Sequence, residues 1–130
     1  MIVVDASALA KALVERSSSA RAVRRRLAGE TLTAPALVDA EVLSVLRGLH
    51  RRGTLAADAA TRTVSLLAAM PLQRVPMPAQ LRRAWQLRQN YSAYDAFYVA
   101  LAELLDCPLV TSDARLSRAT GATCTVELFP

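Results

Sequence analysis

The sequence contains only one histidine, two cysteines and four glycines among 130 residues, and each scarcity excludes a class of site. With His50 alone, one chain can form neither a nuclease that uses two histidines as acid and base nor an HExxH zinc site. Cys107 and Cys124 lack CxxC spacing, which speaks against zinc binding and against a disulfide framework. There is no Gly-rich phosphate loop and no G-x-S-x-G motif. Acidic residues, together with a metal ion, are the remaining candidates for catalysis.

Long apolar runs are also absent. No run reaches the roughly 18 residues that a membrane span needs, and the N-terminal segment lacks the basic start and cleavage site of a signal peptide. Hydrophobic residues nevertheless make up 53% of the chain, which is enough for a core at this length. We therefore expect one soluble, cytoplasmic domain spanning residues 1–130, with no membrane partner.

Lysine is nearly missing, whereas arginine is abundant. Lys11 is the only lysine, the formal net charge is +5, and the isoelectric point is near 10.0. Arginine presents a planar fork that suits phosphates and carboxylates. A basic surface of this kind favours a polyanion such as nucleic acid, or equally an acidic protein partner, and charge alone does not choose between them.

The hydrophobic pattern alternates short strands with helices. We expect strands at residues 2–4, 31–34, 72–75, 108–111 and 124–127, and helices at 7–15, 17–28, 35–52, 56–70, 78–89 and 93–105, with a short helix after 112–113. This alternation predicts an α/β fold in which a mostly parallel sheet lies between helices on both faces. Functional groups in such sheets lie beyond the carboxyl ends of the strands.

Four of the eleven acidic residues stand out from an otherwise solvated set. Asp5 and Asp113 each directly follow a predicted buried strand, so both should lie at the carboxyl edge of the sheet. Glu41 and Asp95 lie among apolar residues of two predicted helices. Burying a carboxylate costs several kcal/mol unless it is paired or bound to a metal.

Each acid also has a structural explanation. Asp5, Asp95 and Asp113 could cap helices, which would stabilise them by roughly 0.5–2 kcal/mol each. Glu41, placed too deep in the predicted 35–52 helix to cap it, could instead pair with an arginine. If all four converge, however, their repulsion would keep some protonated unless a cation were present. Oxygen-only ligands suit Mg²⁺ or Mn²⁺.

Four segments then resemble the PIN domain family and, within it, the VapC-type toxins of toxin–antitoxin pairs. The segments are VVDASAL at residues 3–9, PALVDAEVLSVLR at 35–47, SAYDAFYVALA at 92–102 and LVTSDARL at 109–116. Each segment alone is a weak signal. Together they lie in the family's order along essentially the whole chain, and each carries one of the four acids.

The resemblance implies a three-layer α/β/α fold and an endoribonuclease that depends on Mg²⁺ or Mn²⁺. The resemblance also implies four residues that are both catalytic and metal-binding: Asp5, Glu41, Asp95 and Asp113. Asp5 and Asp95 would be the first metal ligands. Ser7 and Ser112 would support them from nearby, and Arg47, Arg51 and Arg115 would hold the RNA backbone. A homodimer and a cognate antitoxin are the implied partners. Where many relatives carry a further acid, this chain has Ala114 and Arg115, which puts tight binding of a second metal in doubt.

Three other functions remain open on the residues alone. A catalytically silent PIN-like module would bind RNA or protein without cutting. A receiver-like phospho-switch needs a lysine late in the chain, whereas Lys11 lies early. A phosphatase with a D-x-D motif needs a second aspartate where Ser7 stands, in Asp5-Ala6-Ser7.

Overall fold

Five parallel strands form one central sheet. The computed structural model describes residues 1–130, and every pair of neighbouring strands in it is parallel. The strands are β1 (Ile2–Val4), β2 (Leu32–Pro35), β3 (Leu72–Val75), β4 (Leu109–Thr111) and β5 (Val126–Leu128), in the spatial order β3-β2-β1-β4-β5. The prediction of an α/β fold with a mostly parallel sheet is confirmed.

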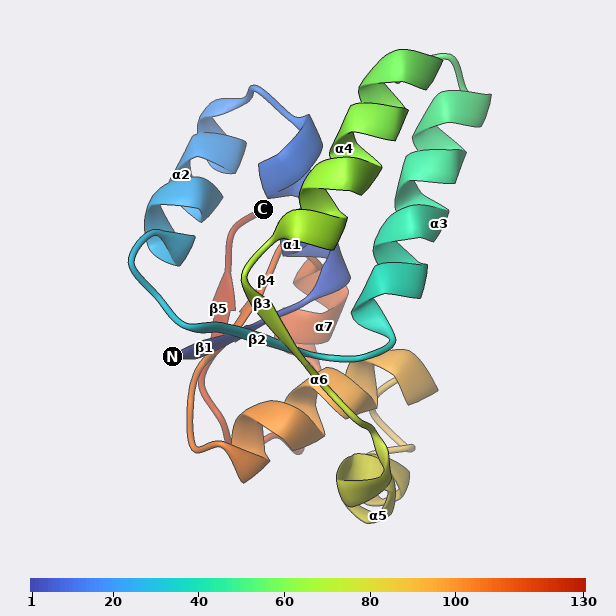
Figure 1. Cartoon of the computed structure of the whole chain (residues 1–130). Helices are drawn as coiled ribbons and strands as arrows, with labels where there is room; N and C mark the ends of the chain where they lie inside the picture. The colour runs from blue at the N-terminus through green and yellow to red at the C-terminus, as the bar shows by residue number, and fades with distance from the viewer.

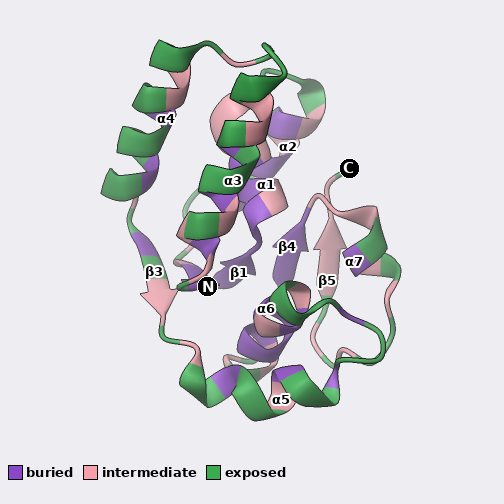
Figure 2. Ribbon diagram, turned by 90° about the vertical axis from the view of Figure 1, so that its right-hand side faces the viewer, coloured by how far each residue is buried: buried purple, intermediate pink, exposed green.

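Helices cover both faces of this sheet (Figures 1 and 2). They are α1 (Ala6–Val14), α2 (Ser18–Leu27), α3 (Val38–Arg51), α4 (Ala57–Ala69), the 3-10 turn η1 (Pro78–Gln80), α5 (Leu81–Gln86), α6 (Ala93–Leu104) and α7 (Ala114–Arg118). Helices α1 to α4 pack on one side and α5 and α6 on the other, while the short α7 lies beside β4 and β5. The result is the expected three-layer arrangement.

The register of the strands sets the position of the acids. β1 is the middle strand, and Val3 pairs with Thr33 of β2 on one side and with Leu109 of β4 on the other. The backbone N–H of Asp5 then donates to the carbonyl of Val110 at 3.0 Å. The ends of β1 and β4 therefore meet at one edge, so that the residues after each strand become neighbours.

Two elements differ from the sequence prediction by more than two residues at an end. Pro35 was expected at the start of the third helix, but it is the last residue of β2. Proline has no N–H to donate to a neighbouring strand, so it is tolerated better at the end of a strand than in its middle. The next hydrogen bond to β3 is made by the N–H of Ala36, which donates to the carbonyl of Val75. The predicted helix at 78–89 is instead a 3-10 turn followed by the six-residue α5, after which the chain turns through residues 87–91.

The core lies where the sheet meets α1 and α6. All three residues of β1 have no exposed surface, and the sides of α1 and α6 that face the sheet are buried (Figure 2). Continuous burial on both faces explains why β1 reads as an unbroken apolar run. No helix has both the length and the apolar character that crossing a membrane requires.

Two leucines of α6 test how the core holds this helix in place. Leu101 is fully buried, whereas Leu104, one turn later, is 59% exposed. We expect Leu101→Ala to destabilise the protein by about 2–5 kcal/mol and the matched Leu104→Ala by less than about 0.5 kcal/mol. Urea unfolding followed by circular dichroism measures both, and equal losses would contradict this packing.

Candidate active site

All four predicted acids line one cleft at the carboxyl edge of the sheet. The cleft has a volume of about 640 Å³, and Asp5, Glu41, Asp95 and Asp113 all contribute to its wall. They come from four separate parts of the chain: the end of β1, helix α3, helix α6 and the end of β4. The fold therefore brings together the residues that the sequence singled out.

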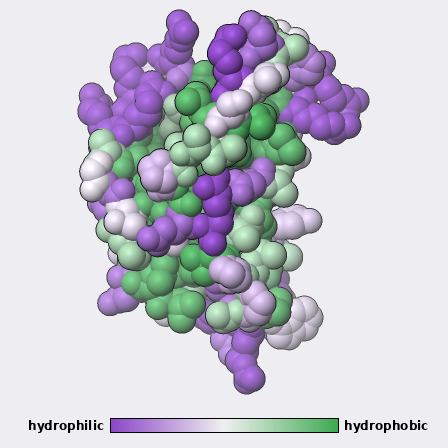
Figure 3. Space-filling view, viewed as in Figure 1, coloured by the Kyte–Doolittle hydropathy of each residue, from purple (hydrophilic) through white to green (hydrophobic).

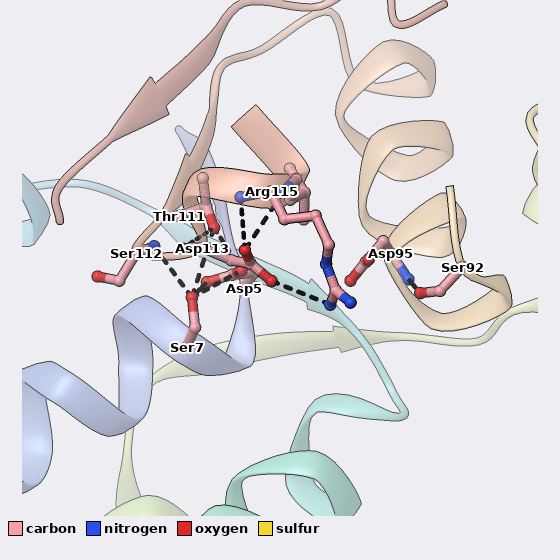
Figure 4. A network of polar contacts seen from close by, with 9 residues as sticks. Asp5, Ser7, Ser92, Asp95, Thr111, Ser112, Asp113 and Arg115 are labelled. Carbon is pink, nitrogen blue, oxygen red and sulfur yellow. Dashed lines mark hydrogen bonds and ion pairs between the residues drawn. The ribbon is translucent and has the colours of Figure 1, made fainter. Parts of the chain in front are cut away.

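Asp5 is the most buried and the most tightly held of the four (Figure 4). Its carboxylate caps α1 by accepting the N–H of Ala8 at 2.8 Å, and it also accepts the hydroxyls of Ser7 and Thr111, the latter at 2.6 Å. Burial raises the pKa of Asp5, and the three hydrogen bonds oppose that rise. Asp5 therefore both caps α1 and lines the cleft.

A small hydroxyl network fixes Asp5 to the end of β4. The Ser7 hydroxyl accepts the backbone N–H of Ser112 at 3.0 Å, and Thr111 accepts that of Asp113 at 2.9 Å. Ser7 and Thr111 thereby join the two strand ends through side chains. Ser112, predicted to support the acids, does so through its backbone, because its own hydroxyl is buried without a partner.

Glu41 is held by a tyrosine rather than by an arginine. Because α3 begins at Val38, Glu41 lies in the first turn, where the helix dipole favours an acid, and not deep in the helix as predicted. The hydroxyl of Tyr98, whose side chain is buried in α6, donates to Glu41 Oε2 at 2.5 Å. Burial raises the pKa of Glu41, the Tyr98 bond lowers it, and the charges of Asp95 and Asp5 raise it further.

Tyr98 is the residue whose role the sequence reasoning missed. A signal for its role was available, because a tyrosine within a strongly apolar helix needs a partner for its hydroxyl. Burial raises the pKa of the Tyr98 phenol, and the hydrogen bond with Glu41 raises it further. The hydroxyl therefore keeps its proton and acts as the donor.

Asp95 has a carboxylate that accepts no hydrogen bond. It lies in the first turn of α6, and its backbone N–H donates to the N-cap Ser92 at 3.1 Å. The cap that was considered for Asp95 is therefore supplied by Ser92. The side chain is left to face Asp5 and Glu41, and its charge raises the pKa of both.

Asp113 is bonded differently from the other three acids. It caps α7 by accepting the N–H of Arg115 at 2.7 Å, and the Arg115 guanidinium lies 3.3 Å from its second oxygen (Figure 4). Asp113 therefore has a structural role and a cationic partner inside the cleft.

Of the seven acids outside the cleft, five pair with arginines, and the other two, Glu15 and Asp106, are exposed to solvent. Glu103 pairs with Arg83 at 2.6 Å, and Asp39 pairs with Arg74 at 3.0 Å. No cationic side chain pairs with Asp5, Glu41 or Asp95. Their oxygen-only donor set fits a hard divalent cation. No three such side chains are yet close enough together to ligate one ion, so binding requires side-chain movement.

The predicted RNA-binding arginines separate in space. Arg115 lines the acid cleft, and so does Arg52 at the end of α3. Arg47 instead lines a separate cavity of about 330 Å³ between α3 and α4, and Arg51 lines neither. Hydrophilic side chains gather at the end of the molecule that holds α2 and the turn between α3 and α4 (Figure 3).

The α/β/α sandwich with an acidic cleft at the carboxyl edge of its parallel sheet defines the structural class of this chain, and comparison with known proteins gives the family. The PIN domain family model matches residues 2–122. This chain is 43% identical to ribonuclease VapC9 of Mycobacterium tuberculosis over 130 residues, covering 100% of this chain and 99% of VapC9. The chain belongs to the PIN domain family, in its VapC branch.

Solved structures show the same fold. VapBC2 from Rickettsia felis, bound to a DNA fragment from its promoter, superposes with a TM-score of 0.71 at 15% identity, covering 100% of both chains. A toxin–antitoxin complex from Klebsiella pneumoniae gives a TM-score of 0.65 at 17% identity, covering 98% of this chain and 96% of the other. The resemblance noted in the sequence is confirmed as family membership.

Burial of the Glu41 carboxylate without a counter-charge, together with the nearby charges of Asp95 and Asp5, predicts that removing this charge stabilises the metal-free protein. Because the pKa of Glu41 is raised on folding, its carboxyl favours the fold below its unfolded pKa, and that contribution is lost as pH rises through the folded pKa. Glu41→Gln, which keeps an oxygen for Tyr98, should raise the melting temperature in chelator at pH 7.5 by about 2–4 °C.

Glu15→Gln, at an exposed position outside the cleft, is the matched control and should change the melting temperature little. The advantage of Glu41→Gln should shrink as the pH falls and vanish below the unfolded pKa of Glu41, where the wild-type carboxyl is protonated in both states. A Gln variant that melts below wild type at pH 7.5 would show that the charge of Glu41 does not destabilise the folded protein.

Proposed function

We propose that this chain is a metal-dependent endoribonuclease that hydrolyses RNA phosphodiester bonds as the toxin of a type II toxin–antitoxin pair. The observation that carries the proposal is the cleft in which Asp5, Glu41 and Asp95 face one another without any cationic partner. The high identity to a VapC ribonuclease along the whole chain supports it. We further propose that residues 1–130 act as one PIN domain in the cytoplasm.

The metal ion is proposed to be Mg²⁺ or Mn²⁺, held by the acids of the cleft. When bound, such a cation lowers the pKa of a coordinated water and stabilises charge on a phosphoryl group. Ser7 and Thr111 hold the Asp5 carboxylate in one orientation, and Tyr98 does the same for Glu41. The protein's part in catalysis is thus to fix two of the acids before any ligand arrives.

Arginines are proposed to hold the RNA backbone on either side of the acids. Arg115 and Arg52 line the cleft itself, so they are placed to donate to phosphate oxygens near the bond that is cut. Arg47 and Arg51, which lie outside the cleft, are proposed to extend the contact along the strand. The net charge of +5 supports binding to a polyanion.

The proposed protein partners are a cognate antitoxin and a second copy of this chain. The Klebsiella pneumoniae neighbour was solved as a toxin–antitoxin complex, and it has the same fold. Large apolar side chains are exposed on α3, α4 and α5, among them Leu43, Leu66 and Trp85, and they supply surface for such contacts.

Cleavage of a mixed RNA pool by the purified, antitoxin-free chain tests the proposal. We expect cutting with Mg²⁺ or Mn²⁺, none with chelator, and a loss of at least about 100-fold in Asp95→Asn, because the least hydrogen-bonded ligand is then neutral. Asp58→Asn is the matched control, since Asp58 is exposed and pairs only with Arg62.

Equal cutting by the Asp95 and Asp58 variants would contradict the proposed site and indicate a contaminating nuclease. A folded protein that binds RNA but cuts with no metal would favour the alternative function, a catalytically silent PIN-like module that binds RNA or protein.

Tyr98→Phe tests whether the tyrosine hydroxyl supports catalysis. Phenylalanine keeps the buried ring but removes the donor to Glu41, so the rate of cleavage should fall by about 10-fold, with a loss of roughly 0.5–1.5 kcal/mol in stability. Tyr94→Phe is the control, because Tyr94 is 63% exposed and its hydroxyl makes no hydrogen bond. If the two variants cut at the same rate, the Tyr98 bond is irrelevant to activity.

A further inference from the structure

We infer that the guanidinium of Arg115 takes the place of a second cation beside Asp113, so that the metal site proposed above, at Asp5, Glu41 and Asp95, holds one divalent cation. The inference rests on the proposed function and deepens it, because it concerns how many ions that site binds. It follows from which of the four carboxylates already has a cationic partner.

Both oxygens of Asp113 are engaged within its own helix end. Oδ1 accepts the N–H of Arg115 at 2.7 Å and that of Leu116 at 3.4 Å, and Oδ2 faces the Arg115 guanidinium at 3.3 Å. Ligating an ion through Oδ1 would compete with the cap of α7, and ligating one through Oδ2 would displace a cation already present. Asp113 is therefore the only one of the four acids whose charge already faces a cationic side chain.

The other three acids have no cationic partner. Asp95 accepts no hydrogen bond, and Glu41 gives only Oε2 to Tyr98, which leaves Oε1 free. Asp5 accepts only neutral donors, namely two hydroxyls and one backbone N–H, so its negative charge has no counter-ion. Together they form a set of three uncompensated carboxylates facing one space.

Arg115 occupies the space where a second cation would be needed. Its side chain extends from α7 toward Asp95, so that the guanidinium lies between Asp113 and Asp95 (Figure 4). It lines the acid cleft and also, with Asp95, a neighbouring cavity of about 100 Å³. No acid stands in the first turn of α7 to help bind another ion there.

A guanidinium can do part of what a second metal does. It carries a permanent positive charge and can donate two parallel hydrogen bonds to phosphate oxygens, but it cannot coordinate and activate a water. The Arg115 side chain is 80% exposed, so it is free to turn from Asp113 to an incoming phosphate. Arg115 would therefore neutralise substrate charge, while water activation would belong to the single ion.

Calorimetric titration of Mn²⁺ into the metal-free protein, without RNA, tests the inference. We expect one Mn²⁺ per wild-type chain, and an affinity at least about 10-fold weaker in Asp95→Asn. Asp113→Asn, which keeps a helix cap, should bind one ion with wild-type affinity. Arg115→Glu, at an exposed position, should bind a second ion.

Two Mn²⁺ ions per wild-type chain, or equal loss of affinity in the Asp113 and Asp95 variants, would overturn the inference while leaving a metal-dependent nuclease intact. A single ion in Arg115→Glu would also overturn it, provided that circular dichroism shows that variant to be folded. Failure of the proposed function looks different, because wild-type protein would then bind no Mn²⁺ and cut no RNA.

Discussion

Burial of Asp5 and Glu41 without a cationic partner, with the charge of Asp95 beside them, is the constraint on which the cleft depends. In a protein with fifteen arginines, five of the seven acids outside the cleft pair with a guanidinium group, as Glu103 pairs with Arg83 and Asp39 with Arg74. The three cleft acids meet only each other and neutral donors. Such an arrangement costs stability in the free protein and is relieved by a divalent cation, so ion binding and stability of the folded state are linked.

The fold places these acids at one edge of the sheet through simple geometry. Parallel strands carry their carboxyl ends to one edge, and the crossovers return α3 and α6 to the same edge from opposite faces of the sheet. Thr111 and Ser7 then tie the end of β4 to Asp5, while Tyr98 of α6 holds Glu41 of α3. These neutral bonds orient the carboxylates of Asp5 and Glu41 without cancelling their negative charge.

The sequence predicted the layers and the convergence of the acids because both follow from local signals. Unbroken apolar runs indicated β1 and β4. Because the two strands are parallel, the acids that follow them lie at the same edge of the sheet. Local signals could not show that β2 includes Pro35, which moved Glu41 into the first turn of α3. Nor could they show the contact between Tyr98 and Glu41, 57 residues apart, or the different cavities lined by Arg47 and Arg115. Each of these depends on how helices pack on the finished sheet.

The central claim is that the three uncompensated carboxylates together hold a divalent cation. The most direct test is a crystal structure of the antitoxin-free protein grown with Mn²⁺, with anomalous scattering data collected above the manganese absorption edge. The account predicts one anomalous peak ligated by oxygens of Asp5, Glu41 and Asp95. A map with no peak in the cleft, or with its main peak on Asp113 and away from Asp95, would contradict it.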